Sequence, residues 1–121
     1  MSNFQTRNYE KPLDERTLEF GKRVIRLCKQ LPKNSVTIEP IKQVMRSGCS
    51  IGANYREAND ALSKKDFVFR MRISRKEAKE TLYWLELLVE AYPECQNEIT
   101  PLMQEIQELI KILSAIIEKS K

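Results

Sequence analysis

The 121-residue sequence predicts an all-α fold, an antiparallel up-down-up-down four-helix bundle. Four stretches repeat apolar residues at three- and four-residue spacing, and short connections marked by proline or serine separate them, which favours antiparallel neighbours. The 41% apolar and 31% charged residues are typical of amphipathic helices. No apolar run approaches the roughly 18 residues that span a membrane. We expect one cytoplasmic domain of residues 13–121 that follows a flexible tail of residues 1–12.

The first two predicted helices lie before residue 63. Asp14 is expected to cap the first helix, and Pro32 to end it. Its buried face is predicted to hold Leu18, Gly21, Val24, Ile25, Cys28 and Leu31. Thr37 is expected to cap the second helix, with Pro40 in the first turn, where a missing N–H costs nothing. The buried stripe there is Ile41, Met45, Gly48, Ile51, Tyr55, Ala58 and Leu62.

The third predicted helix is about 29 residues long, from a cap at Ser63 with Asp66 in the capping-box position to Pro93. Its buried stripe is Phe67, Met71, Ser74, Ala78, Leu82, Leu85, Val89 and Tyr92. Thr100 and Pro101 are typical of a cap and first helical residue for the last helix, which could also start a few residues earlier with Pro101 in its first turn. One apolar seam of this helix is Leu102, Ile106, Leu109, Leu113 and Ile116. A second seam is Met103, Ile110 and Ile117.

The second seam makes the apolar face of the last helix wider than one bundle core needs. We therefore expect part of it to contact another subunit in a homo-oligomer. Gly48 and Gly52 each cost about 1 kcal/mol relative to Ala inside a helix, so a close approach of a neighbouring helix or an exposed backbone that meets a ligand must offset them. Ser50 and Asn54, poor helix formers near this seam, indicate a polar contact between helices or subunits.

Positive charge is concentrated in residues 42–79, which contain ten Lys/Arg and four Asp/Glu, whereas residues 80–121 contain three and eight. The predicted third helix carries Lys64, Lys65, Arg70, Arg72, Arg75, Lys76 and Lys79. Helical spacing puts Lys65, Phe69, Arg72, Lys76 and Lys79 on one outer face. Cations repeated along a rigid surface suit nucleic-acid phosphates, and an exposed ring suits an unpaired base. The alternative is a solvated face whose Arg72 or Lys76 pairs with Glu80.

The chain has no histidine, the commonest general base and metal ligand. Its three cysteines, Cys28, Cys49 and Cys95, are far apart and form no C-x-x-C pair, so we expect buried free thiols. No acid–base set is visible. The sequence therefore predicts a protein that is not an enzyme and needs no metal or cofactor.

Several segments of the chain resemble a known family. They are Arg46-Ser-x-x-Ser50-Ile51-x-x-Asn54-x-x-Glu57-Ala58, Ser63-x-x-Asp66-Phe67 and Leu82-Tyr83-Trp84-Leu85. The segment Lys76-Glu77-Ala78-x-Glu80-Thr81-x-Tyr83-Trp84 resembles one branch of that family. The chain resembles the bacterial four-helix-bundle proteins encoded in intervening sequences of 23S ribosomal RNA genes, and is similar to the accessory variability protein of diversity-generating retroelements. The resemblance implies a homopentameric ring with basic surfaces for RNA or DNA.

The leading hypothesis is a non-enzymatic oligomeric bundle that binds nucleic acid, RNA first, through the basic face of the third helix. The predicted contacts are Lys64, Lys65, Phe69, Arg72, Arg75, Lys76 and Lys79, and those for helix or subunit packing are Gly48, Gly52, Asn54, Met103, Ile110 and Ile117. The alternative is a scaffold that docks a nucleic-acid enzyme, such as a reverse transcriptase, without binding nucleic acid itself.

Overall fold

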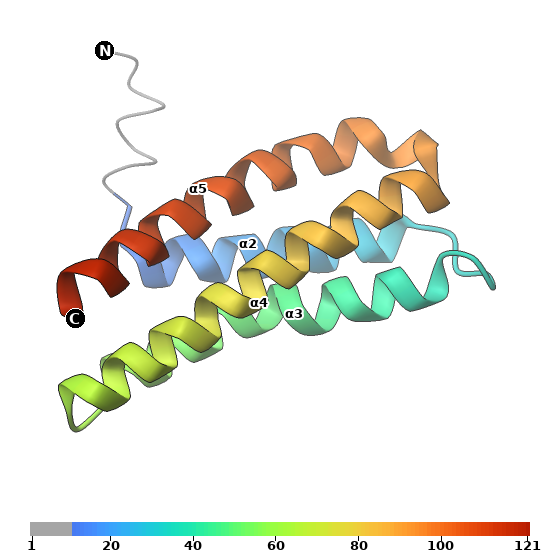
Figure 1. Cartoon of the computed structure of the whole chain (residues 1–121). Coiled ribbons are helices and arrows are strands. Elements are labelled where there is room, and N and C mark those ends of the chain that lie inside the picture. The colour runs from blue at the N-terminus through green and yellow to red at the C-terminus, as the bar shows by residue number, and fades with distance from the viewer. Residues whose placement is uncertain (1–10) are drawn as a thin grey trace, which may run out of the picture.

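The computed structural model describes residues 11–121, and within them the chain forms four α-helices and one 3₁₀ turn (Figure 1). The predicted tail of residues 1–12 lies outside this range except for Lys11 and Pro12, which are exposed. The elements are α2 (Leu13–Gln30), α3 (Ile38–Asn59), α4 (Lys64–Ala91), η1 (Pro93–Cys95) and α5 (Gln96–Ser120). The all-α four-helix fold that the periodicity predicts is confirmed.

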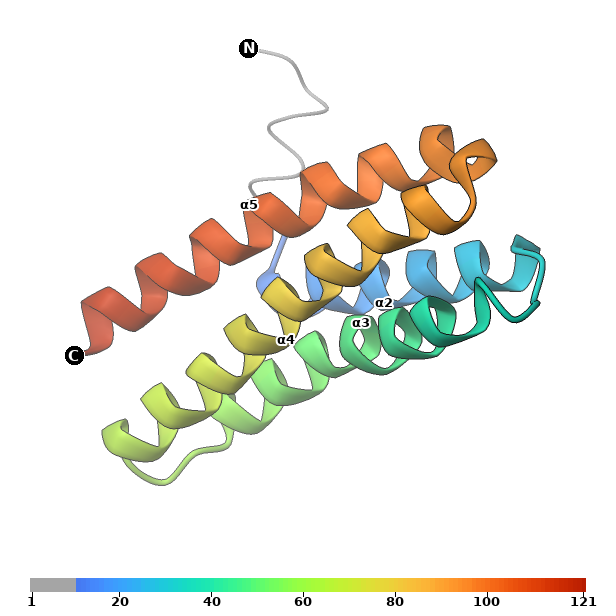
Figure 2. The same ribbon diagram turned by 45° about the vertical axis from the view of Figure 1, so that its right-hand side comes forward.

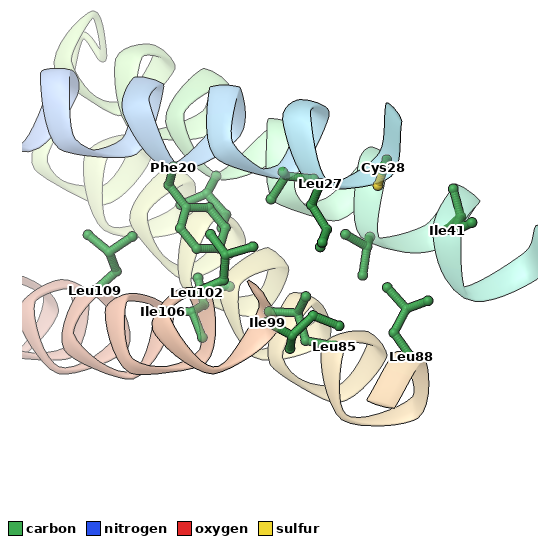
Figure 3. Close-up of a cluster of buried hydrophobic side chains, with 14 of the residues drawn as sticks. Phe20, Leu27, Cys28, Ile41, Leu85, Leu88, Ile99, Leu102, Ile106 and Leu109 are labelled. Carbon is green, nitrogen blue, oxygen red and sulfur yellow. The ribbon is translucent and has the colours of Figure 1, made fainter. Parts of the chain in front are cut away.

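Each helix packs on its neighbour in sequence, and α5 returns to contact α2, so the four helices enclose one core. The contact between α3 and α4 is the most extensive, and that between α2 and α5 is the least. Figures 1 and 2 show α3 and α4 side by side along most of their length. Figure 3 shows all four helices contributing to the centre, through Phe20, Leu27, Cys28, Ile41, Leu85, Leu88, Ile99, Leu102, Ile106 and Leu109.

The buried face of α2 is rotated from the predicted one. Leu18 and Ile25 are 44% and 39% exposed, whereas Phe20 and Leu27 are at most 5% exposed. The reason is that α2 packs against both α3 and α5, so its inner face lies between the two partners. Asp14 does not cap the helix, because α2 already begins at Leu13.

The predicted boundary between α3 and α4 is confirmed on the α4 side. Ser63 caps α4, with its hydroxyl oxygen 3.0 Å from the backbone N of Asp66. Leu62, predicted to be buried, is fully exposed, because α3 ends at Asn59 and the helical stripe does not continue into the loop that contains Leu62. Thr37 precedes α3 without a side-chain cap, since its backbone is already helical and its hydroxyl oxygen accepts from the backbone N–H of Asn34 at 3.0 Å.

Of the two predicted starts of α5, the earlier one is confirmed and the cap at Thr100 is wrong, although Pro101 lies beyond the first turn. The turn η1 leads directly into the helix at Gln96, because Cys95 and Ile99 are both buried in the core and hold this segment against it. Pro101 is therefore inside the helix. The Thr100 hydroxyl donates to the Gln96 carbonyl at 2.9 Å and does not act as a cap.

Two residues of α5, Ile116 and Ile117, each lie in the other seam from the one predicted. Ile117, assigned to the outer seam, is 1% exposed and belongs to the core. Ile116, assigned to the inner seam, is only partly buried. Met103 and Ile110 remain partly buried at the edge of the core, so together with Ile116 they form the outer apolar seam of α5.

Candidate nucleic-acid interface

The outer face of α4 carries a row of exposed side chains, as the sequence predicts. Lys65, Arg72, Lys76 and Lys79 are all exposed, and Phe69 is 58% exposed among them. We call these five residues the α4 basic face. It extends over about 21 Å, at 1.5 Å per residue of helix. The neighbouring Phe67 and Val68 pack against the core, which fixes the rotation of α4 and holds the basic face outward.

The acidic residues around this face have other partners. Glu80 accepts from the Nη2 of Arg46 at 2.9 Å, so the predicted pairing of Glu80 with Arg72 or Lys76 is not formed. Asp66 pairs with Arg70 at 3.5 Å, and Glu118 with Lys121 at 2.9 Å.

The basic face is consequently left without direct acidic partners. Between residues 11 and 121, no ion pair within 4 Å includes any of the four cations of the α4 basic face. Lys121, which donates to Glu118, lowers the pKa of that carboxyl, and the charges of Arg75 and then Arg72 lower it further. The α4 basic face therefore presents positive charge that the described part of the fold does not neutralise.

Two of the predicted phosphate contacts lie beside α5 instead of on this face. Lys64 donates to the backbone carbonyl of Lys121 at 3.3 Å. Arg75 is partly buried and donates to the Ser114 hydroxyl at 3.3 Å. These contacts tie the first half of α4 to the end of α5, so Lys64 and Arg75 have a packing role in addition to their charge.

Arg46 joins α3 to α4. Its guanidinium contacts the carboxylates of Glu77 and Glu80, at 3.1 Å and 2.9 Å. The hydrogen bond to Glu80 and the charge of Glu77 raise the pKa of Arg46. Next to these contacts, the Thr81 hydroxyl of α4 donates to the buried Ser47 hydroxyl of α3 at 2.8 Å. Two of the segments that carry the family resemblance, those that begin at Arg46 and at Lys76, thus contact each other.

Ser74 makes a further polar contact between α3 and α4, and this contact is buried, as is the one between Thr81 and Ser47. The Ser74 hydroxyl donates to the backbone carbonyl of Ile51 at 2.8 Å. The sequence placed Ser74 on the buried stripe of α4 without a partner for it, because nothing in the sequence pairs residues 23 positions apart. Together with the Arg46 contacts, it fixes the register of α3 against α4.

The glycines of α3 contact α2. A Cβ at Gly48 would lie 3.0 Å from one γ carbon of Val24, and a Cβ at Gly52 would lie 2.9 Å from the Thr17 hydroxyl. Of the two readings of Gly48 and Gly52, the close approach of a neighbouring helix is therefore confirmed. Asn54 donates to the carbonyl of Ser50 within its own helix at 2.9 Å, so within the described chain it makes no helix-to-helix contact of the predicted kind.

A groove of about 260 Å³ runs between α2 and α3, and sequence analysis missed it. Leu18 and Ile25 line it, together with Gly21, Cys49 and Gly52. Cys49 is exposed here, so the prediction that all three thiols are buried is wrong for this residue. The sequence does contain a pattern that indicates such a groove. Leu18 and Ile25 flank the small Gly21 on one helix, and the small Cys49 and Gly52 lie on the helix that faces it.

The two other thiols are buried and free. Burial raises the pKa of the Cys28 thiol to about 11. Residues 11–121 contain no cluster of three or more His, Cys, Asp or Glu suited to a metal ion. In the same range, no helix is both long and apolar enough to cross a bilayer.

The fold and the α4 basic face define a small antiparallel four-helix-bundle protein with a cationic surface on its third helix. Residues 13–115 match the family described as 23S rRNA-intervening sequence protein. The chain belongs to this family.

A solved structure is similar across nearly the whole chain. It is a protein from Bacteroides thetaiotaomicron VPI-5482, described as having unknown function and as coming from the S23 ribosomal protein family. The two chains are 36% identical and align with a TM-score of 0.76 over 88% of this chain and 98% of the other. No curated protein sequence matches the chain.

Proposed function

We propose that this protein binds nucleic acid, RNA in the first instance, through the α4 basic face and catalyses no reaction. The observation that carries the proposal is the row of four exposed cations with no ion pair within 4 Å among residues 11–121. The ion pair between Arg46 and Glu80 supports the proposal further. In a helix whose outer face served only to contact solvent, a pair between Lys76 and Glu80, one turn apart, would stabilise the helix.

A rigid row of cations binds phosphates by releasing the counterions condensed on the nucleic acid. The logarithm of the binding constant then falls with the logarithm of salt concentration, with a slope of about −0.7 per phosphate on a single strand and about −0.9 on duplex DNA. Four phosphate contacts per protomer give a slope of about −3. Binding through phosphates alone carries no sequence preference, so different RNA sequences are expected to bind similarly.

The test compares two variants that lose the same charge. One replaces Lys65, Arg72, Lys76 and Lys79 with Ala. The control replaces four cations of α2 and α3, namely Lys22, Lys29, Lys42 and Arg56, which are also exposed. RNA binding is measured by fluorescence anisotropy over a series of salt concentrations. We expect the first variant to lose binding and about 3 units of slope, and the control to keep most of both.

The result that overturns the proposal is a wild-type protein that fails to retain RNA or DNA at low salt. Equal loss of binding in both variants would also contradict it, because the net charge and not the α4 basic face would then be responsible. In either case the scaffold hypothesis becomes the leading one, and the groove between α2 and α3 is the first surface to mutate. Circular dichroism of both variants checks that the helices persist.

We also propose that the protein forms a homo-oligomer, with a pentameric ring expected from the family resemblance. Partly buried apolar side chains on the outer side of α4 and α5 support this, since Leu82 and Ile110 line one surface groove and Val89 and Met103 line another. In a ring the α4 basic face repeats around the assembly, so weak contacts add through multivalency. Light scattering should give about five times the monomer mass of 14.2 kDa.

A further inference from the structure

One residue of the α4 basic face cannot be explained by phosphate binding. Phe69 is 58% exposed on a helix whose adjacent residues, Phe67 and Val68, pack against the core. Between residues 11 and 121 the paired aromatic rings are Tyr83 and Trp84, whose centroids are 5.4 Å apart, so Phe69 stacks on no other ring there. Its exposed ring is therefore available to a partner.

The cations on either side of Phe69 limit what this partner can be. Lys65 lies one turn before the ring and Arg72 lies one turn after it, each about 5–6 Å away along the helix surface. A ligand that covers the ring must satisfy positive charge on both sides and offer a flat apolar face between them. A nucleotide strand has this pattern, because phosphates flank each base along the backbone.

The base must be unpaired for this contact to form. In a duplex the base faces are stacked on one another, and a ring on the surface of a helix meets only groove edges and backbone. In a single strand each base exposes a face, and aromatic side chains stack on it whatever the sequence. We infer that the α4 basic face selects single-stranded nucleic acid, with one unpaired base stacked on Phe69.

This inference rests on the proposed function and adds the class of nucleic acid to it. The basic face extends over about 21 Å, which corresponds to about six nucleotides at the 3.4 Å rise of a stacked strand. One protomer is thus expected to occupy a short single-stranded segment, such as a loop or an end of a structured RNA. A strand much shorter than six nucleotides should leave part of the cation row uncovered and bind more weakly.

The test uses the full-length protein, a 12-nucleotide oligouridylate and a 12-base-pair RNA duplex at one salt concentration. Phe69→Ala is expected to weaken binding to oligouridylate about 5- to 140-fold, the range found for a lost base–aromatic stack. Binding to the duplex should change less than twofold. The control is Val36→Ala, which removes a similarly exposed apolar side chain from the connection between α2 and α3, and it should change neither affinity.

A second variant reports the stack directly. In Phe69→Trp combined with Trp84→Phe, the single indole replaces the Phe69 ring, and its fluorescence should be quenched by oligouridylate and not by the duplex. The wild-type Trp84 signal gives the reference for quenching far from the basic face. Light scattering on each variant checks that its mass equals that of the wild type.

Three results would overturn the inference, and they differ from a failure of the proposed function. The first is a wild-type protein that binds the duplex as tightly as the single strand with the expected salt dependence. The second is a loss on Phe69→Ala that is equal for both ligands, which indicates a wedge inserted into a duplex. The third is a fall in mass, which makes Phe69 a subunit contact. Failure of the wild-type protein to bind either ligand instead refutes the proposed function.

Discussion

Three glycines, Gly21, Gly48 and Gly52, lie at the contact between α2 and α3. We expect replacement by Ala to raise the free energy of unfolding at Gly21 and to lower it at Gly48 and Gly52. In an open helical site, Gly→Ala stabilises a protein by about 1 kcal/mol, because Ala has the higher helix propensity. Gly21 is such a site, since an added Cβ would meet its nearest atoms at 3.9 Å, an ordinary van der Waals distance. We expect Gly21→Ala to stabilise the protein by about 0.5–1 kcal/mol.

At Gly48 the same change is expected to destabilise. The new Cβ would lie 3.0 Å and 3.3 Å from the two γ carbons of Val24, which is fully buried. A β-branched side chain in a helix has one strongly preferred rotamer, so Val24 cannot turn aside and the two helices must separate. Overpacking of this kind costs about 1–3 kcal/mol, and after the gain in propensity we expect a net loss of about 1 kcal/mol.

Gly52 adds a polar version of the same conflict. A Cβ there would lie 2.9 Å from the Thr17 hydroxyl, which donates to the backbone carbonyl of Leu13 at 2.9 Å. Movement of Thr17 would weaken this hydrogen bond, so Gly52→Ala is expected to cost about 1–2 kcal/mol.

The assay is urea denaturation followed by circular dichroism, at one protein concentration for all variants because an oligomer unfolds in a concentration-dependent way. A Gly48→Ala variant that is as much stabilised as Gly21→Ala would contradict the predicted clash with Val24. A double-mutant cycle sharpens the test. With Val24→Ala as background, the conflict with the γ carbons is absent, and Gly48→Ala should become neutral or stabilising.

Four further predictions concern a buried ion pair, the thiols and the apolar seam of α5. Arg16 is buried and forms a two-point ion pair with Glu105, at 2.7 Å and 3.0 Å, so Arg16→Ala should lower the free energy of unfolding by about 3–5 kcal/mol in urea denaturation; a cost below about 1 kcal/mol would contradict it. In the native protein Cys49 should react with a thiol reagent before Cys28 and Cys95, and burst labelling of all three would refute this. Because the Cys28 pKa is raised from 9.0 to about 11, its contribution to stability is present below pH 9 and is lost as pH rises through 11, so Cys28→Ala should flatten the alkaline fall in stability. Ile110→Glu should reduce the mass in light scattering and keep the helices, whereas Ile117→Glu, in the core, should unfold the chain; an unchanged mass for Ile110→Glu would remove Ile110 from the proposed interface.

The sequence alone determined the features that depend on contacts within one helix. The three- and four-residue spacing of apolar side chains was sufficient for the four helices and for the stripe of α4. Ser63 was recognisable as a cap because a cap acts on a backbone N–H only three residues away. The exposure of Lys65, Phe69, Arg72, Lys76 and Lys79 followed from the same periodicity, since the opposite side of α4 is apolar.

Only the tertiary structure decided which partner each face meets. Periodicity locates a buried stripe to within about one residue around a helix, so it could not choose between Leu18 and Phe20 on α2, or between Ile116 and Ile117 on α5. These choices depend on where two neighbouring helices lie. In the candidate site, the partner of Glu80 was likewise decided by a neighbouring helix. Within α4 it could pair with Lys76, but Arg46 reaches it from α3, 34 positions earlier in the chain. That contact leaves the cations of the α4 basic face without an acidic partner on their own helix. A contact between residues so far apart is fixed by packing and not by local spacing.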